Sequence, residues 1–299
     1  MNNKRKAFSI RDLENLSGIK AHTIRIWEKR YDLLSPDRTS TNIRTYDINS
    51  LQKLLNITLL YNGGYKISKI AKIPEKSIPL MVREIVSENN IKDHSISAFK
   101  LAMINFDQSL FAKTYNDLLT DRSFPEIFRD IFIPLLRELG MLWQTDTISA
   151  AHEHFIACLI KQKTLANTEK LQHIAPVKKD KVFVPYLPEN EIHDMGLLYL
   201  NYEIVARGYR SIYLGQMVPM ENLVDIMGYF DNLYFVSYLT VGPGKDKIHQ
   251  YLKDFESMAN GHGGVKLWLL GRQTQYLAET KLPDFVNIFS SLDEVVGRL

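Results

Sequence analysis

The stretch Glu191-Ile-His193-Asp-Met-Gly196 places a carboxylate two residues before an imidazole and a glycine three residues after it. The imidazole is the side chain that most readily changes its charge near neutral pH, and it is also a common metal ligand. A carboxylate bonded to one ring nitrogen orients the other. On these residues alone two interpretations are open: a ligand-binding loop, or a surface histidine at the start of a helix.

The elements around this stretch indicate where it lies in a fold. It follows the apolar run VFVPYLP and begins a helical stretch over 194–207. Short apolar runs alternate with helical stretches through residue 299, which is typical of a doubly wound parallel sheet that binds ligands at the carboxyl ends of its strands. The expected strands are VFVPY, SIYLGQ, LYFVSYL, VKLWLLG and FVNIF, and the further expected helices are 220–229, 245–258, 273–280 and 292–298.

Two more polar or small-residue motifs end later strands of this sheet. Ser237-Tyr-Leu239 ends the third strand, and Gly271-Arg272 ends the fourth. With the acid-x-His-x-x-Gly stretch, this order resembles the cobalamin-binding module shared by methionine synthase and the cobalamin-dependent mutases. The pattern of that module continues with Ser-x-Leu and then Gly-Gly, so Arg272 departs from it.

The resemblance implies a role for each matching residue. His193 would be the metal ligand, below cobalt, and Glu191 would hydrogen-bond the other ring nitrogen. Gly196 would pack closely on the nucleotide tail of the cofactor. The displaced base would be buried near Ser237, which supplies a hydroxyl, and Leu239. Gly271 would correspond to the first glycine of the family's Gly-Gly pair, which lies along the nucleotide tail of the cofactor.

The middle of the chain has four amphipathic segments, which predict a four-helix bundle. These segments are 95–103, 107–120, 123–143 and 147–172. Trp143 closes the third segment, and Glu153-His154 lies early in the fourth. Adjacent helical residues point about 100° apart, so Glu153 and His154 do not both face inward. Taken alone, these residues favour an aromatic core residue beside a solvated pair.

The start of the chain has the pattern of two helices around a tight turn. Ser9 is positioned to cap the first helix, and Ser17-Gly18 supplies the turn. This is the plan of a helix-turn-helix, whose second helix enters the major groove of DNA. The exposed side of the second helix, 21–31, carries His22, Arg25, Lys29 and Arg30.

A polar segment, SPDRTSTNIRTYDINS, follows and predicts a small hairpin, or wing, before a helix that Asp47 or Asn49 caps. TIRIWEKRY and the basic hairpin that ends in R-T-Y resemble the winged-helix DNA-binding domain of the MerR family. The resemblance implies that Arg25 approaches the groove together with Lys29, and that the wing residues Arg38 and Arg44 touch flanking phosphates.

The charge distribution agrees with a nucleic-acid-binding head. Residues 1–75 contain 14 Lys or Arg and 7 Asp or Glu, a net charge of +7, and the remaining residues contain 23 and 27, a net charge of −4. No apolar run is long enough for a membrane span. The one cysteine, Cys158, excludes an internal disulfide framework and is expected to be buried. We therefore expect a cytoplasmic protein without a membrane partner.

The sequence thus predicts a multidomain chain. An all-α winged helix-turn-helix head is followed by a linker helix, a four-helix bundle that caps cobalamin, and an α/β doubly wound, flavodoxin-like, parallel-sheet domain that binds it. The expected bounds are 1–75, 76–94, 95–175 and 180–299. A small DNA reader usually works as a dimer on paired half-sites, so the expected partners are double-stranded operator DNA and further copies of the chain, as a dimer or tetramer.

The order of these parts resembles the CarH and LitR group of light-sensing MerR-family repressors. The resemblance implies a regulator rather than an enzyme, with adenosylcobalamin as the cofactor. It also implies that Trp143, Glu153 and His154 enclose the adenosyl ligand above the corrin. The group has a histidine directly after this tryptophan, where this sequence has Gln144. A sensor of cobalamin abundance, a cofactor-independent repressor with a degenerate module, and a corrinoid methyl carrier or mutase subunit stay open as alternatives.

Overall fold

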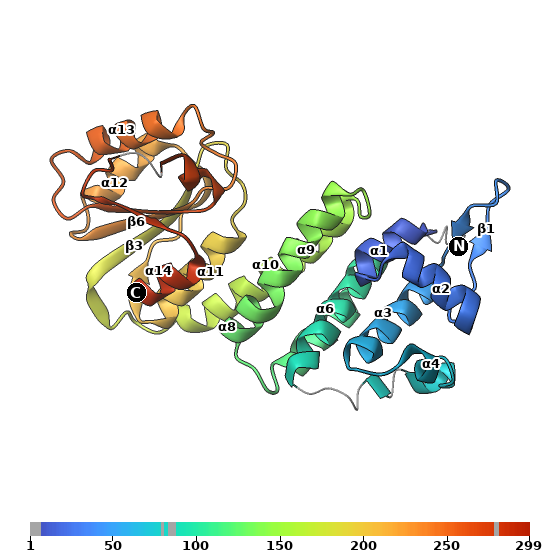
Figure 1. The fold of residues 1–299 in the computed structure, drawn as a ribbon. Coiled ribbons are helices and arrows are strands. Elements are labelled where there is room, and N and C mark those ends of the chain that lie inside the picture. The colour runs from blue at the N-terminus through green and yellow to red at the C-terminus, as the bar shows by residue number, and fades with distance from the viewer. Residues whose placement is uncertain (1–6, 79–80, 83–87, 278–280) are drawn as a thin grey trace, which may run out of the picture. The chain divides into compact units, whose positions relative to one another are not determined.

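A computed structural model describes residues 7–78, 81–82, 88–277 and 281–299 (Figure 1). The chain divides into two compact units, Met1–Ile160 and Lys161–Leu299. The first unit contains a helix-turn-helix head and a helical region, and the second contains a parallel sheet with helices on both faces. The predicted fold class is confirmed. Among the described residues, none of the helices is both long and apolar enough for a bilayer crossing.

The head begins with α1 (Ile10–Ser17) and α2 (Ala21–Tyr31). Ser9 and Asp12 form a reciprocal cap at the start of α1, because each backbone N–H donates to the other side chain, at 2.8 and 3.2 Å. Gly18 ends α1 with φ of 77°, a conformation that glycine adopts without strain. The apolar positions of both helices are buried: Leu13, Leu16, Ile24 and Trp27.

The predicted wing is an antiparallel pair of short strands, β1 (Asp37–Arg38) and β2 (Arg44–Thr45). Asp47, one of the two predicted caps, accepts the N–H of Ser50 at 2.8 Å and starts α3 (Ile48–Asn62). Two short elements complete the head, α4 (Ile67–Ile70) and η1 (Glu75–Ser77).

The helical region follows the four predicted segments: the first is longer than predicted, the second and fourth are shorter, and the third is divided into three consecutive elements. Its elements are α6 (Glu88–Asn105), α7 (Gln108–Leu118), α8 (Phe124–Ile127), the π turn η2 (Phe128–Phe132), α9 (Ile133–Gln144) and α10 (Ala150–Gln172). α6 runs without a break across the predicted boundary between linker and bundle at 94/95. Part of the predicted linker helix, residues 79–80 and 83–87, lies outside the described residues.

Aromatic rings fill the core of this region. Phe99 of α6 lies 4.9 Å from the ring of Phe111 and 5.6 Å from that of Phe132, and all three are buried. The prediction for Cys158 is wrong, because the cysteine is exposed. On α10 the neighbouring Ile156, Leu159 and Ile160 are buried, so the helical period turns position 158 outward.

The second unit is a parallel sheet of order β4-β3-β6-β7-β8. Its strands are β3 (Lys178–Pro188), β4 (Tyr209–Ser211), β6 (Leu233–Tyr238), β7 (Lys266–Leu270) and β8 (Val286–Phe289), and β5 (Gly215–Val218) pairs with the end of β3. β3 lies between β4, the next strand in sequence, and β6. The chain therefore reverses its direction of winding at β3, and the carboxyl ends of β3 and β6 form the switch point.

Helices cover both faces of this sheet (Figure 1). α11 (Met195–Ala206) and α14 (Leu292–Arg298) contribute to one apolar core, and α12 (Val224–Met227) and α13 (Ile248–Ala259) contribute to the other. Three predicted elements differ in detail. The predicted strand SIYLGQ is divided between β4 and β5, the helix 220–229 begins with the 3-10 turn η3 (Met220–Leu223), and the helix expected from residue 273 is the 3-10 turn η4 (Arg272–Leu277).

Candidate functional site

Glu191 lies at the switch point, with its carboxylate fully buried. Oε2 accepts three consecutive backbone N–H groups, those of residues 240–242 after β6, at 2.7, 2.6 and 3.0 Å. Oε1 accepts the backbone N–H groups of Ile192 and His193, both at 2.9 Å. The carboxylate therefore ties the loop after β3 to the loop after β6.

His193 is held by the same carboxylate, because its Nδ1 lies 2.6 Å from Oε1 of Glu191. Burial raises the pKa of Glu191, but the hydrogen bonds from Val241 and His193 outweigh it, and the pKa is lowered overall. An ionised carboxylate accepts hydrogen bonds and does not donate them, so Nδ1 carries a proton, and in the neutral ring this leaves the lone pair on Nε2. The imidazole side chain is 52% exposed. The predicted pair is thus present: the imidazole of His193 is half exposed, and the carboxylate of Glu191 that holds it is buried.

Ser237 and Leu239, at the end of β6, are both fully buried. The backbone N–H of Leu239 donates to the carbonyl of Leu270 at 2.7 Å, which holds the ends of β6 and β7 together. No described residue bonds to the Ser237 hydroxyl oxygen, which is shielded from solvent. A buried hydroxyl without a partner is unfavourable in the free protein and is satisfied by a ligand that brings one.

The two predicted glycines both lie close to neighbouring atoms. A Cβ at Gly196 would lie 2.6 Å from the ring of Tyr238, so this ring fills the space beside the start of α11. Gly271 has φ of 103°, and a Cβ there would lie 2.5 Å from the carbonyl oxygen of Leu239. Arg272, which follows it, is exposed.

In the first unit, Trp143 lies at the end of α9 with 55% of its surface exposed. The interpretation of this tryptophan as a core residue is therefore wrong. Glu153 and His154, on the first turns of α10, form a pair with Oε2 and Nε2 3.5 Å apart, in which His154 is exposed and Glu153 is partly exposed. His152 is buried, with its ring stacked on that of Phe106 at 4.6 Å. The side chain of Gln144 lies outside the described residues.

The predicted DNA-binding residues of α2 form one exposed face. His22, Arg25, Lys29 and Arg30 are all exposed on it. The four positions span little more than two helical turns, so their charges and donors are available together on the surface that a helix-turn-helix presents to a groove.

The wing residues behave differently from each other. Arg38 is exposed and bonds to Asn42 Oδ1 at 2.7 Å across the tip of the wing. Arg44 is half-buried, and its Nε forms an ion pair with Glu28 of α2 at 3.1 Å. Glu28 also accepts the hydroxyl of Tyr46. Arg44 therefore braces the wing against α2, and beside it lies a depression of about 590 Å³ between these two elements.

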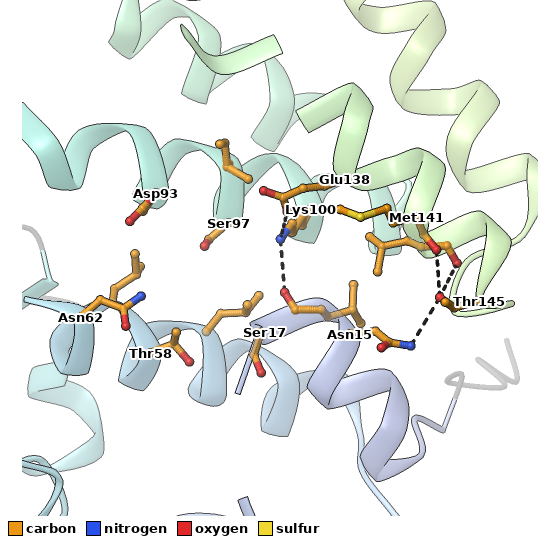
Figure 2. A pocket seen from close by; sticks show the side chains of 16 residues that line it. Asn15, Ser17, Thr58, Asn62, Asp93, Ser97, Lys100, Glu138, Met141 and Thr145 are labelled. Carbon is orange, nitrogen blue, oxygen red and sulfur yellow. Dashed lines mark hydrogen bonds and ion pairs between the residues drawn. The ribbon is translucent and has the colours of Figure 1, made fainter. Parts of the chain in front are cut away.

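A junction between head and helical region, within the first unit, was not anticipated from the sequence. Figure 2 shows a cavity of about 550 Å³ lined by α1, α3, α6 and α9. Lys100 of α6 is buried there. It donates to the carbonyl oxygen of Leu16 at 3.2 Å and forms an ion pair with Glu138. A lysine inside the apolar stretch ISAFKLAMI is the one sequence signal of this contact.

The loop that follows Trp143 also contacts the head. Asn15 of α1 donates from Nδ2 to the hydroxyl of Thr147 at 2.8 Å. The same Nδ2 lies 3.4 Å from the hydroxyl of Thr145 (Figure 2). Thr145 in turn donates to the carbonyl of Met141, one turn before the end of α9, at 3.0 Å. Hydrogen bonds thus connect α1 to the helix end that carries Trp143.

Within the described ranges, no group of three or more His, Cys, Asp or Glu side chains could hold a metal ion. The donor set at the switch point is one imidazole and its carboxylate. One such imidazole provides a single position in a metal's coordination sphere.

Comparisons with known proteins agree with this arrangement. Residues 8–76 match the MerR HTH family of regulatory proteins, and residues 96–165 match a B12-binding domain. The HTH-type transcriptional repressor CarH of Myxococcus xanthus is 27% identical over 224 residues, which cover 73% of this chain and 74% of CarH. The repressor CarA of the same organism is 23% identical over 212 residues, which cover 70% of this chain and 68% of CarA.

A solved structure is similar in fold over most of the chain. The monomethylamine corrinoid protein of Methanosarcina barkeri is 14% identical, with a TM-score of 0.58, and the match covers 71% of this chain and 98% of that protein. At this level of identity the likeness concerns the fold alone. Together these matches span both units of the chain.

Proposed function

We propose that cobalamin controls DNA binding by this chain, which is a transcription regulator with a MerR-type helix-turn-helix domain and a B12-binding domain, homologous to the repressors CarH and CarA. In this proposal the chain acts as a repressor, as a dimer or tetramer in the cytoplasm, and not as an enzyme. The basic face of α2 reads double-stranded operator DNA, with His22, Arg25, Lys29 and Arg30 at the groove.

The observation that carries the proposal is the imidazole of His193. Its Nδ1 is bonded to the buried carboxylate of Glu191, and its Nε2 faces outward. A carboxylate on the other nitrogen fixes the tautomer of a metal-binding histidine and raises its basicity. A single axial nitrogen matches a metal whose remaining positions are filled by a macrocycle, as in a corrinoid.

The end of β6 supports the same ligand. The Ser237 hydroxyl is buried without a partner, beside the loop that Glu191 anchors. A hydroxyl in this position can donate to a ring nitrogen of a buried base. The donor set of this chain therefore fits a cobalamin held through His193, with its own base displaced towards Ser237 and Leu239.

The upper face of the cofactor is assigned to the first unit. Trp143 and His154 are exposed and Glu153 is partly exposed, so all three are available to a ligand. Adenosylcobalamin, the form we propose, supplies a cobalt–carbon bond that light can break. The contacts of Asn15 with Thr145 and Thr147 give the helix end at Trp143 a direct connection to α1 of the head. A ligand controls DNA affinity only through contacts that differ between two states, and this connection offers such contacts.

A second function is favoured by one observation. The ring of Tyr238 fills the space beside Gly196, where the cobalamin resemblance expects the nucleotide tail. A regulator that represses without a cofactor needs no space for the nucleotide tail. In such a regulator the second unit would serve dimerisation or the binding of a partner. In a cobalamin sensor, Tyr238 must leave this position when the tail enters.

Absorbance spectroscopy separates these functions. The full-length protein and His193→Ala are mixed with adenosylcobalamin in the dark, and spectra are taken before and after green light. We expect the wild-type protein to give the spectrum of a histidine-ligated corrinoid. The variant should lose that spectrum and bind at least tenfold more weakly, the lower end of the range for metal-site substitutions. His249→Ala, an exposed histidine on α13, is the matched control and should behave as wild type.

DNA binding is measured in parallel on sequences selected from a random double-stranded pool. Both histidine variants should select the same sequences as the wild-type head, because neither residue lies in the first unit. No spectral change on mixing with wild-type protein would support the cofactor-independent regulator. A histidine-ligated spectrum that His193→Ala retains would refute the ligand assignment.

A further inference from the structure

Three buried side-chain atoms without a hydrogen-bond partner occur in the part of the chain that the structure describes. They are the Tyr213 hydroxyl, Ser237 Oγ and Gln273 Oε1. All three belong to the second unit. Tyr213 follows β4, Ser237 is the next-to-last residue of β6, and Gln273 follows β7. They therefore gather at the carboxyl ends of three strands.

The order of the strands relates these atoms to His193. β4, β3, β6 and β7 are consecutive neighbours in the sheet, and His193 follows β3. Neighbouring parallel strands are separated by about 4.8 Å, so the four strands span roughly 14 Å. Each of them brings one polar group to the same edge, which is the edge where α/β sheets bind ligands.

Gln273 is connected to His193 through hydrogen bonds. Its backbone N–H donates to the carbonyl of Leu239 at 3.0 Å, and its Nε2 donates to the carbonyl of Thr240 at 3.2 Å. Thr240 in turn donates its N–H to Glu191, which holds His193. Since Nε2 is the end bonded to a carbonyl, Oε1 is the free end of the amide, and it is an acceptor.

Tyr213 lies on the other side of His193. Burial raises the pKa of its phenol, and the nearby charge of Asp194 raises it further, so the group stays protonated. Asp194 follows His193 directly and forms an ion pair with Lys161. The Tyr213 hydroxyl is thus a donor on the β4 side of His193, and Gln273 Oε1 is an acceptor on the β7 side.

Unpaired buried polar atoms are few in folded proteins, because each costs the hydrogen bonds that it made to water. Neither Tyr213 nor Gln273 gains anything in the free protein from its unpaired atom. Phenylalanine and methionine would fill the same space without that cost. Their presence at the carboxyl ends of neighbouring strands is explained by a partner that arrives with a ligand.

We propose that Tyr213 and Gln273 are two further ligand-binding residues, which bind primary carboxamide groups at the rim of the ligand. A carboxamide carries an oxygen that accepts from Tyr213 and N–H groups that donate to Gln273 Oε1. The inference rests on the proposed cobalamin site, whose ligand has such groups around its macrocycle. Because both atoms are shielded in the free protein, the side chains over them move when the ligand binds.

The first test uses Tyr213→Phe, which removes only the hydroxyl. The affinity of the full-length protein for adenosylcobalamin is measured by absorbance titration in the dark. We expect it to fall about tenfold, or about 1.4 kcal/mol. The melting temperature of the ligand-free variant should stay the same or rise by about 2–4 °C, because an unpaired buried group has been removed.

Tyr209→Phe is the matched control. Tyr209 begins β4, at the opposite end of that strand, and its hydroxyl donates to the carbonyl of Leu299 at 2.8 Å. This variant should melt at a lower temperature and keep the wild-type affinity. If Tyr213→Phe behaves like this control, its hydroxyl has an internal partner, such as a buried water, and the assignment of Tyr213 is overturned.

Gln273 is tested with two variants of similar size. Gln273→Met lacks an acceptor and should bind adenosylcobalamin about tenfold more weakly than wild type. Gln273→Glu keeps an acceptor, so it should bind more tightly than Gln273→Met even if it melts at a lower temperature. Equal affinities in these two variants would overturn the assignment of Gln273. If wild-type protein gives no histidine-ligated spectrum, the proposed function itself fails, which is a separate outcome.

Discussion

His193 and Trp143 both have exposed side chains, but they differ in the hydrogen bonds that hold them within their own units. His193 is bonded to a buried carboxylate that accepts N–H groups from two loops. Trp143 is 55% exposed at the end of α9, and Glu153 and His154 form a partly exposed pair whose Oε2 and Nε2 atoms lie 3.5 Å apart. A preorganised position loses little freedom when a ligand binds, whereas an unsupported one gains its order from the ligand.

The substitution Glu191→Gln should have the largest effect on stability, because it removes the support that His193 has and Trp143 lacks. The amide keeps the size of the side chain, but it loses the charge and places N–H groups against some of the donors that now point at the carboxylate. We expect the free energy of unfolding of the second unit to fall by about 3 kcal/mol, measured by urea denaturation. Glu153→Gln is the control, with an expected change within about 0.5 kcal/mol. Equal effects of the two substitutions would mean that the two regions are supported alike.

The pH dependence of unfolding sharpens the same comparison. The folded-state pKa of Glu191 is lowered, so the carboxylate stabilises the fold above its unfolded pKa, about 4.3. This contribution is lost as the pH falls through the folded pKa. The stability difference between wild type and Glu191→Gln should therefore be constant near neutral pH and shrink below about pH 4.3. A difference that grows on acidification would contradict an ionised Glu191.

Trp143→Ala should have the smallest effect on the free protein. Because the side chain is largely exposed, the free energy of unfolding should change by less than about 0.5 kcal/mol. The affinity for adenosylcobalamin should fall about fivefold to tenfold, since the indole is proposed to enclose the adenosyl group. The variant should bind hydroxocobalamin, which lacks the adenosyl group, with the same affinity as the wild-type protein. A loss of affinity for both compounds would show that Trp143 does not discriminate the upper ligand.

Local patterns predicted the elements of this chain well, since their causes are local. Ser9 caps α1 and Asp47 caps α3 as expected, because a cap depends on residues within one turn. The parallel sheet followed from alternating apolar runs and helices. The bond between Glu191 and His193 was expected from the cobalamin resemblance and is present. The division of one predicted strand into β4 and β5 was not expected, since pairing with β3 decides it.

Contacts between residues far apart in the chain could not be predicted. Arg44 was expected to touch phosphates, and in the structure it pairs with Glu28. The connection of Asn15 to Thr147 and the burial of Lys100 beside Leu16 depend on how the head packs on α6 and α9. The spacing of residues in the sequence does not predict such pairs, because each of these side chains could equally well lie on an exposed surface.

The amino-acid sequence alone determined the order of the parts, the capped helices, the basic face of α2 and the short-range pair of Glu191 and His193. These depend on periodicity, and on side chains a few residues apart. Only the tertiary structure decided that the loop after β6 surrounds Glu191 with N–H groups, that Trp143 is exposed, and that unpaired atoms of Tyr213, Ser237 and Gln273 gather at one edge. The reason is physical: burial and hydrogen-bond satisfaction are set by neighbours in space.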